Sequence, residues 1–221
     1  MVKAVIFDVD GTLIDSVTLH ARSWQDAFRE FGHDIELEEI RGQIGKGGDQ
    51  LMPVFLAKDE QDAIQDKLQE RRAAIFKERY FDKIEVFPHV RDLFQRILKD
   101  GKQILLASSA KGEELQKYKK LAGIDDLLDA ETSSDDADKS KPHPDIFQAA
   151  LAKLNGIDAG NAIVIGDTPY DAEAAGKAGI RTVGVLCGGF TEDSLRQAGC
   201  VQVYPGPAAL VACFGDTLLA K

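Results

Sequence analysis

The stretch Lys3-Ala-Val-Ile-Phe-Asp-Val-Asp-Gly-Thr-Leu-Ile-Asp15 joins an apolar run to two aspartates that are separated by one residue. A continuous apolar run of this length is typical of a strand that is covered on both faces, as in a parallel sheet. Asp8 and Asp10 follow the run directly, so we expect them at the carboxyl end of the strand. Two carboxylates this close repel each other unless a cation or a proton neutralises them. The stretch therefore indicates both a fold and a candidate site.

Further apolar runs recur along the chain and alternate with helical patterns. They predict strands at 103–107, 162–165 and 182–186, and a weaker edge strand at 201–204. Strands and helices alternate in this way from about residue 86 onward. The pattern predicts an α/β fold with a doubly wound, mostly parallel, Rossmann-like sheet.

The segment 15–86 has helical periodicity and no convincing strand. Val17 and Ala21, for example, lie on the same face of a predicted helix. We therefore predict an all-α-helical cap domain at 15–86, inserted into an α/β core made of 1–14 and 87–221. We expect the two crossings between core and cap to act as a hinge.

The composition excludes several classes of function. The 221 residues carry a formal net charge of -10, and no basic patch counters it, so nucleic acid and anionic membranes are not expected partners. No apolar run approaches the ~20 residues of a membrane span, and the N-terminus does not resemble a signal peptide. The three cysteines have no metal-site spacing, which favours reduced thiols. We expect a cytoplasmic protein that is a monomer or a weak dimer.

Chemically useful side chains follow several of the predicted strands. Ser108 and Asp167 end two of them, and Lys141 precedes the helix that leads to the strand before Asp167. Ligands bind beyond the carboxyl ends of the strands in an open parallel sheet, so these residues should converge with Asp8 and Asp10. Carboxylates suit Mg²⁺, and a lysine with a hydroxyl suits phosphoryl oxygens. The set predicts phosphoryl transfer, in which one aspartate attacks phosphorus and a second moves protons.

These residues resemble the four ordered motifs of the haloacid dehalogenase superfamily, and the likeness covers essentially the whole chain. The motifs are Asp8-Val-Asp10-Gly-Thr12, Ser108, Lys141 in Lys-Pro-His-Pro-Asp-Ile-Phe, and Gly166-Asp-Thr-Pro-Tyr-Asp171. The resemblance implies that Asp8 is the nucleophile and a Mg²⁺ ligand. Asp10 would be the acid and base, and its backbone carbonyl would help to bind the metal. Asp167 would be a third ligand, and Asp171 either a ligand or a partner of the metal site, although it could also simply complement a helix dipole.

The resemblance also implies roles for the remaining motif residues. Ser108 and Lys141 would hold the transferred phosphoryl group, and Thr12 would brace the nucleophile loop. Ser109 is an alternative to Ser108, and either serine could instead cap the following helix. Lys139 is an alternative to Lys141, but the Lys-Pro step favours Lys141.

The cap should select the substrate. Lys46, in the loop Gly45-Lys-Gly-Gly48, could meet a substrate anion or could be a solvated lysine. In the similar beta-phosphoglucomutases, a histidine at the position of His20 helps to couple cap closure to proton transfer. The lysine and arginine that those enzymes use around the cap loop have no clear counterpart here.

The predicted function is a Mg²⁺-dependent phosphatase for a small phosphorylated metabolite, similar to phosphoglycolate or a sugar phosphate, that acts through an aspartyl-phosphate. The first alternative is a sugar-phosphate mutase that resembles the beta-phosphoglucomutases and uses the same aspartates. The second is a non-catalytic receiver-like module, against which Asp10 and the cap argue. Asp10 also favours phosphate chemistry over the dehalogenases, which lack an acid at that position.

Overall fold

The computed structural model describes residues 1–110, 112–154 and 156–221, and its centre is a six-stranded parallel sheet. The strand order is β5-β4-β1-β6-β7-β8, and all five pairings are parallel. The strands are β1 (Ala4–Phe7), β4 (Gln103–Ala107), β5 (Ala130–Thr132), β6 (Ala162–Gly166), β7 (Arg181–Val185) and β8 (Cys200–Tyr204). The predicted α/β fold with a parallel sheet is confirmed, and the predicted edge strand is β8.

Helices cover both faces of the sheet, which explains the continuous apolar runs. In β1, Val5 and Phe7 pack on one face, whereas Ala4 and Ile6 pack on the other. The first face is covered by α5 (Val90–Lys99), α6 (Gly112–Ala122) and α10 (Pro207–Ala212), and the second by α7 (Asp145–Lys153) and α8 (Pro169–Lys177). The short helix α9 (Glu192–Gln197) packs against β8. Every residue of β1 is therefore buried, and the polar residues that follow it begin where the strand ends.

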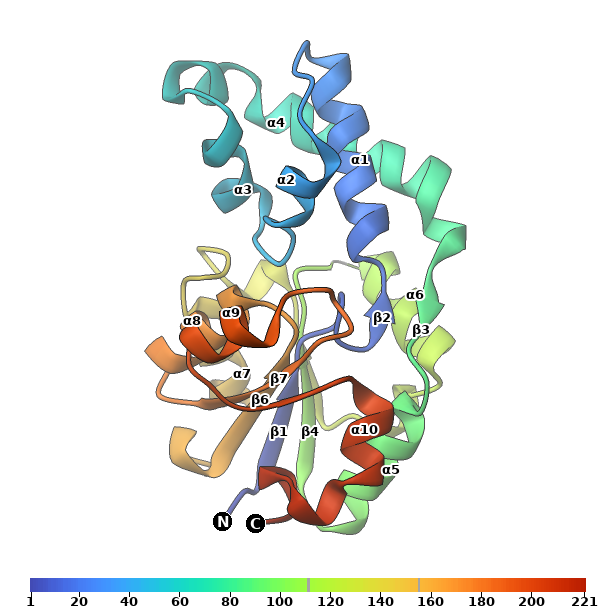
Figure 1. The fold of residues 1–221 in the computed structure, drawn as a ribbon, viewed down its shortest axis with the longest axis vertical. Helices are drawn as coiled ribbons and strands as arrows, with labels where there is room; N and C mark the ends of the chain where they lie inside the picture. Colours follow the sequence, from blue (N-terminus) through green and yellow to red (C-terminus); the bar gives the residue numbers. More distant parts are fainter. Residues whose placement is uncertain (111, 155) are drawn as a thin grey trace.

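Four helices between β1 and α5 form a separate layer above the carboxyl ends of the strands (Figure 1). They are α1 (Val17–Glu30), α2 (Leu37–Arg41), α3 (Gly48–Phe55) and α4 (Lys58–Ile75), and a π-helical turn (Phe76–Tyr80) and a 3-10 turn (Phe81–Lys83) follow. They enclose an apolar cluster of their own that includes Trp24, Phe28 and Leu68. We call this layer the cap. Among the described residues, no helix combines the length and the apolar character that a membrane span requires.

The two crossings between core and cap form a small antiparallel sheet, which the sequence did not predict. β2 (Ile14–Asp15) pairs with β3 (Glu85–Val86), with Ile14 opposite Val86. Two-residue strands are too short to show a period, so pattern analysis misses them. The predicted domain boundaries, at 14/15 and 86/87, fall at this sheet. Pairing the two crossings ties the entry and the exit of the cap together.

Candidate active site

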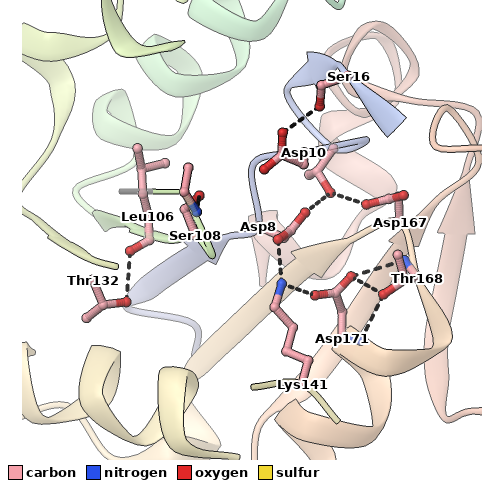
Figure 2. A network of polar contacts seen from close by, with 12 residues as sticks. Asp8, Asp10, Ser16, Leu106, Ser108, Thr132, Lys141, Asp167, Thr168 and Asp171 are labelled. Atoms are coloured by element: carbon pink, nitrogen blue, oxygen red, sulfur yellow. Dashed lines mark hydrogen bonds and ion pairs between the residues drawn. The ribbon is translucent and has the colours of Figure 1, made fainter. Parts of the chain in front are cut away.

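The predicted motif residues meet at the carboxyl edge of the sheet, where β1, β4 and β6 end (Figure 2). Asp8 follows β1, Ser108 follows β4 and Asp167 follows β6. Lys141 reaches the same place from the loop before α7, and Asp171 from the first turn of α8. Carboxylate oxygens of Asp8, Asp167 and Asp171 all lie within 4.8 Å of one another. We call these three acids together with Lys141 the Asp8 cluster.

Lys141 is the cation of the Asp8 cluster. Its Nζ donates to Asp8 Oδ1 at 2.5 Å and to Asp171 Oδ1 at 2.7 Å, and its side chain is only 2% exposed. Burial lowers the pKa of Lys141, but the charges of Asp171 and Asp8 outweigh burial and raise it above its usual value. Lys141 therefore stays charged and offsets part of the negative charge around Asp8.

One lysine does not neutralise three buried acids. Burial raises the pKa of Asp8 to about 7, although Lys141 opposes the shift. Burial and the charges of Asp8 and Asp171 also raise the pKa of Asp167 well above its usual value. Thr12 Oγ1 lies 3.0 Å from both Asp8 Oδ2 and Asp167 Oδ1, but a hydroxyl has a single proton to donate. The cluster thus has room for one more positive charge.

An unpaired oxygen marks where a cation would fit. Asp167 Oδ2 is buried and has no hydrogen-bond partner among the described residues. It faces the backbone of Gly11 and Gly188, where a Cβ atom on either glycine would overlap it. Gly11 also has a positive φ of +83°, which L side chains rarely adopt. Carboxylate oxygens are ligands that Mg²⁺ prefers, and no described residue donates a hydrogen bond to this one, so these residues fit the predicted metal.

A Gly188→Ala substitution should damage this site without unfolding the core. The added methyl group would overlap Asp167 Oδ2, so the carboxylate must move. A displacement of about 1 Å in an active site can cost roughly 100-fold in rate, and we expect a loss of that order in kcat/KM. The measurement is phosphate release, compared with Gly176→Ala as a matched control. Gly176 lies on α8 and has open space around it, so equal activities of the two variants would contradict this account of Gly188.

Asp171 both caps α8 and binds Lys141. Its Oδ1 accepts from Lys141, while Oδ2 accepts from Thr168 Oγ1 at 2.6 Å and from the Thr168 backbone N–H at 3.1 Å. Thr168 Oγ1 in turn accepts from the Asp171 backbone N–H, which completes a capping box at the start of α8. One carboxylate therefore fixes the helix and also orients Lys141.

The Asp10 carboxylate forms its hydrogen bonds with Ser16 and His20, on the cap side of the Asp8 cluster (Figure 2). Its Oδ1 accepts from Ser16 Oγ at 2.5 Å and from His20 Nε2 at 2.9 Å. Burial would raise the pKa of Asp10, but the contacts with His20 and Ser16 outweigh it and lower the pKa to about 2. The structure thus places two of the predicted residues, Asp10 and His20, together and apart from the nucleophile candidate.

The two serine candidates differ in exposure. Ser108 is fully buried, and its Oγ accepts from the Ala110 backbone N–H at 3.0 Å, whereas Ser109 is exposed. This contact lies in the loop before α6 and is not a contact with the helix itself, and Ser108 follows β4 directly. Among the lysines, Lys139 is exposed and Lys141 is buried in the Asp8 cluster.

Lys46 lies at the interface of cap and core, beside but not within the Asp8 cluster. Its Nζ donates to Gln43 Oε1 at 2.6 Å and lies 4.7 Å from the centre of the Tyr170 ring. Burial lowers the pKa of Lys46, and the nearby Glu173 opposes the shift. The residues around this loop hold the cap on the core, because Tyr170 Oη donates to the Gly42 carbonyl at 2.6 Å.

Sequence reasoning did not identify several residues near the site. Arg41, at the end of α2, donates through Nη2 to the Gly188 carbonyl at 3.1 Å and so links the cap to the loop beside Asp167. Arg72 on α4 and Tyr118 on α6 both contact His20. Tyr118 has the spacing of a core position, and Arg72 belongs to a long charged segment. Only the fold brings these side chains to the site.

The parallel sheet, the acidic cluster at its carboxyl edge and the helical layer above define a capped α/β enzyme. A family model described as Haloacid dehalogenase-like hydrolase matches residues 5–185, and the chain belongs to this family. The resemblance seen in the four motifs is thereby confirmed.

Curated relatives and a solved structure agree with this assignment. The pyrophosphatase PpaX of Oceanobacillus iheyensis is 28% identical over 188 residues, which cover 83% of each chain. The phosphoglycolate phosphatase of Pseudomonas savastanoi pv. phaseolicola is 29% identical over 191 residues, 84% of this chain and 70% of the relative. A hydrolase from Pseudomonas syringae has a TM-score of 0.87 at 26% identity and covers 97% of this chain and 98% of its own.

Proposed function

We propose that the protein is a Mg²⁺-dependent phosphoric monoester hydrolase that acts through an aspartyl-phosphate on Asp8. The observation that carries the proposal is the Asp8 cluster itself. Three buried acids lie together with one lysine, which binds Asp8 and Asp171, and the third acid, Asp167, keeps a buried oxygen without a partner in the part of the chain that the structure describes. The relatives named as phosphatases and pyrophosphatases support the same class of reaction.

The chemistry follows from what each side chain can do. An Asp8 oxygen attacks phosphorus, and the bond from phosphorus to the leaving oxygen breaks while Asp10, which enters this step protonated beside the bound ester and not in its ionised contact with His20 and Ser16, donates its proton to that oxygen. Asp10 then takes a proton from water as the water attacks phosphorus, which releases phosphate and restores Asp8. Lys141 offsets the negative charge of Asp8 and of the phosphoryl oxygens, and Thr12 keeps Asp8 in place through a hydrogen bond.

Asp8, Asp167 and Asp171 are the side chains that would hold Mg²⁺, together with the Asp10 carbonyl. When bound, the ion would neutralise the carboxylates and polarise the phosphoryl group. We infer that the cap covers the site during turnover, because Gly42 and Arg41 already bind core residues.

A phosphate-release screen tests the proposal. Phosphoglycolate, sugar phosphates, glycerol phosphate, pyrophosphate and p-nitrophenyl phosphate would be assayed with Mg²⁺ and with EDTA. We expect hydrolysis of at least one ester, with activity that is lost in EDTA and restored by added Mg²⁺. Equal activity with and without the metal would contradict the metal dependence, and absence of hydrolysis with every ester would contradict the reaction class.

The site would bind a small phosphorylated metabolite. That the protein is a monomer or a weak dimer stays a prediction, as does its cytoplasmic location. The mutase alternative is not favoured by a specific contact. Lys46 is bonded to Gln43 of its own loop. A mutase would require a bisphosphorylated sugar for turnover and would release little free phosphate, so the same screen separates the two reactions.

A further inference from the structure

A second polar group lies next to the Asp8 cluster, at the junction of core and cap. It contains the carboxylate of Asp10, the imidazole of His20 on α1, and two side chains of α6, Glu114 and Tyr118. We call these four residues the Asp10 network. Tyr118 is 1% exposed, and the Glu114 side chain is 24% exposed.

His20 Nε2 is the centre of this network. It lies 2.9 Å from Asp10 Oδ1, 3.3 Å from Tyr118 Oη and 3.6 Å from Glu114 Oε1. Tyr118 Oη donates to Glu114 Oε1 at 2.7 Å, so the second carboxylate is held in position. The imidazole therefore has one carboxylate within hydrogen-bond distance and another just beyond it.

Arg72 fixes which ring nitrogen carries the hydrogen. Its Nη2 lies 2.5 Å from His20 Nδ1, and a guanidinium can only donate, so Nδ1 accepts. Nε2 then carries the hydrogen and donates it to Asp10. The His20 side chain is 7% exposed and its ring stacks on Phe76 with 4.1 Å between centroids, so it cannot turn this N–H toward solvent.

In the proposed reaction, Asp10 has to reach an ester bound beside Asp8. Ser16 and His20 both bind Oδ1 and hold the carboxylate toward the cap, so we take the Asp10 carboxyl to turn away from them when it protonates a leaving oxygen bound beside Asp8. The buried His20 N–H would then lose its carboxylate acceptor and be left with the neutral hydroxyl oxygen of Tyr118, 3.3 Å away, so loss of the charged partner opposes the movement. A replacement acceptor would remove this obstacle.

We propose that Glu114 is a positioning residue that accepts the His20 Nε2–H when Asp10 turns toward the substrate, and that Tyr118 holds Glu114 ready for this exchange. A shift of well under 1 Å brings Oε1 into hydrogen-bond distance of Nε2, since the two atoms start 3.6 Å apart. Glu114 touches neither substrate nor metal and acts only through His20 and Asp10. The inference rests on the phosphatase function proposed above.

The test compares two leaving groups. p-Nitrophenolate departs without a proton, whereas an alkoxide needs the proton from Asp10. In Glu114→Leu, we expect kcat/KM to fall roughly tenfold for the alkyl phosphate that ranks highest in the screen, and to stay within about twofold for p-nitrophenyl phosphate. Glu114→Gln keeps an oxygen that can accept from Nε2–H and should recover most of the loss. A general structural defect would lower both rates together.

Glu113→Leu is the matched control, because Glu113 is the preceding residue on α6 and its side chain is 83% exposed, paired with Lys77. It should leave both rates unchanged. Equal losses on the two esters in Glu114→Leu, or no loss at all, would overturn the proposal. If melting curves show that Glu114→Leu is unfolded, Tyr118→Phe, which removes the hydroxyl that holds Glu114, is tested with the same two esters. The proposal predicts a loss for the alkyl phosphate and not for p-nitrophenyl phosphate. A wild-type enzyme that hydrolyses neither ester would instead overturn the proposed function, and this inference with it.

Discussion

Asp8→Asn is expected to abolish phosphate release, with a loss on the order of 10⁵-fold, because it removes the proposed nucleophile. The amide has the shape of the carboxylate but lacks its charge and its reactive oxygen. Lys141 keeps its bond to Asp171, so the side chains around residue 8 should keep their positions. Phosphate release measures the loss, and acid-quenched mass spectrometry should detect a phosphoryl-enzyme in the wild type only.

The fold of this variant should be intact. Asp8 is one of three buried acids that repel one another, so neutralising it relieves repulsion while it weakens one ion pair. We expect a melting temperature close to that of the wild type. Asp15→Asn is a suitable control, because Asp15 ends β2 and is exposed. Hydrolysis by Asp8→Asn at near wild-type rate would rule out the aspartyl-phosphate mechanism.

Much of the core could be predicted because its signals are local. Each buried strand of a parallel sheet is a short apolar run, and the polar residue that follows it lies at the carboxyl edge. Asp8, Ser108 and Asp167 were found in this way, without knowledge of the strand order. β5 was not predicted, because it has only three residues, with Glu131 in the middle, and therefore no apolar run.

The surroundings of Asp10 could not be predicted, because they depend on contacts between distant elements. His20 is ten residues from Asp10, but Arg72 and Tyr118 are 52 and 98 residues from His20. Nothing in the pattern of α4 separates Arg72 from the solvated charges beside it. Similarly, no sequence pattern shows that Gly188, in the loop after β7, lies against Asp167.

Lys141→Met should remove both activity and a large part of the stability of the metal-free protein. Methionine can fill the space of the lysine stem, but it leaves Asp8 and Asp171 buried without their cation. Removing one partner of a buried ion pair typically costs about 3–5 kcal/mol in the free energy of unfolding. Lys139→Met is the matched control, because Lys139 is exposed two residues earlier and should tolerate the change.

The stability loss in Lys141→Met should depend on pH with a defined sign. In the wild type, burial already raises the pKa of Asp8 from 3.8 to about 7, and Lys141 opposes that rise. Without Lys141, the folded-state pKa rises further above its unfolded value, so the folded variant binds a proton that the unfolded chain releases. Folding is then favoured at low pH and loses stability as pH rises through this raised pKa.

Urea denaturation in EDTA at pH 5 and pH 8 measures this effect, and the deficit of Lys141→Met relative to the wild type should be larger at pH 8. Added Mg²⁺ should recover part of the stability, because a cation bound by Asp8, Asp167 and Asp171 replaces the missing positive charge. It should not recover activity, since the ion cannot also supply the ammonium donor. A deficit that is independent of both pH and Mg²⁺ would mean that Lys141 contributes by packing and not by its charge.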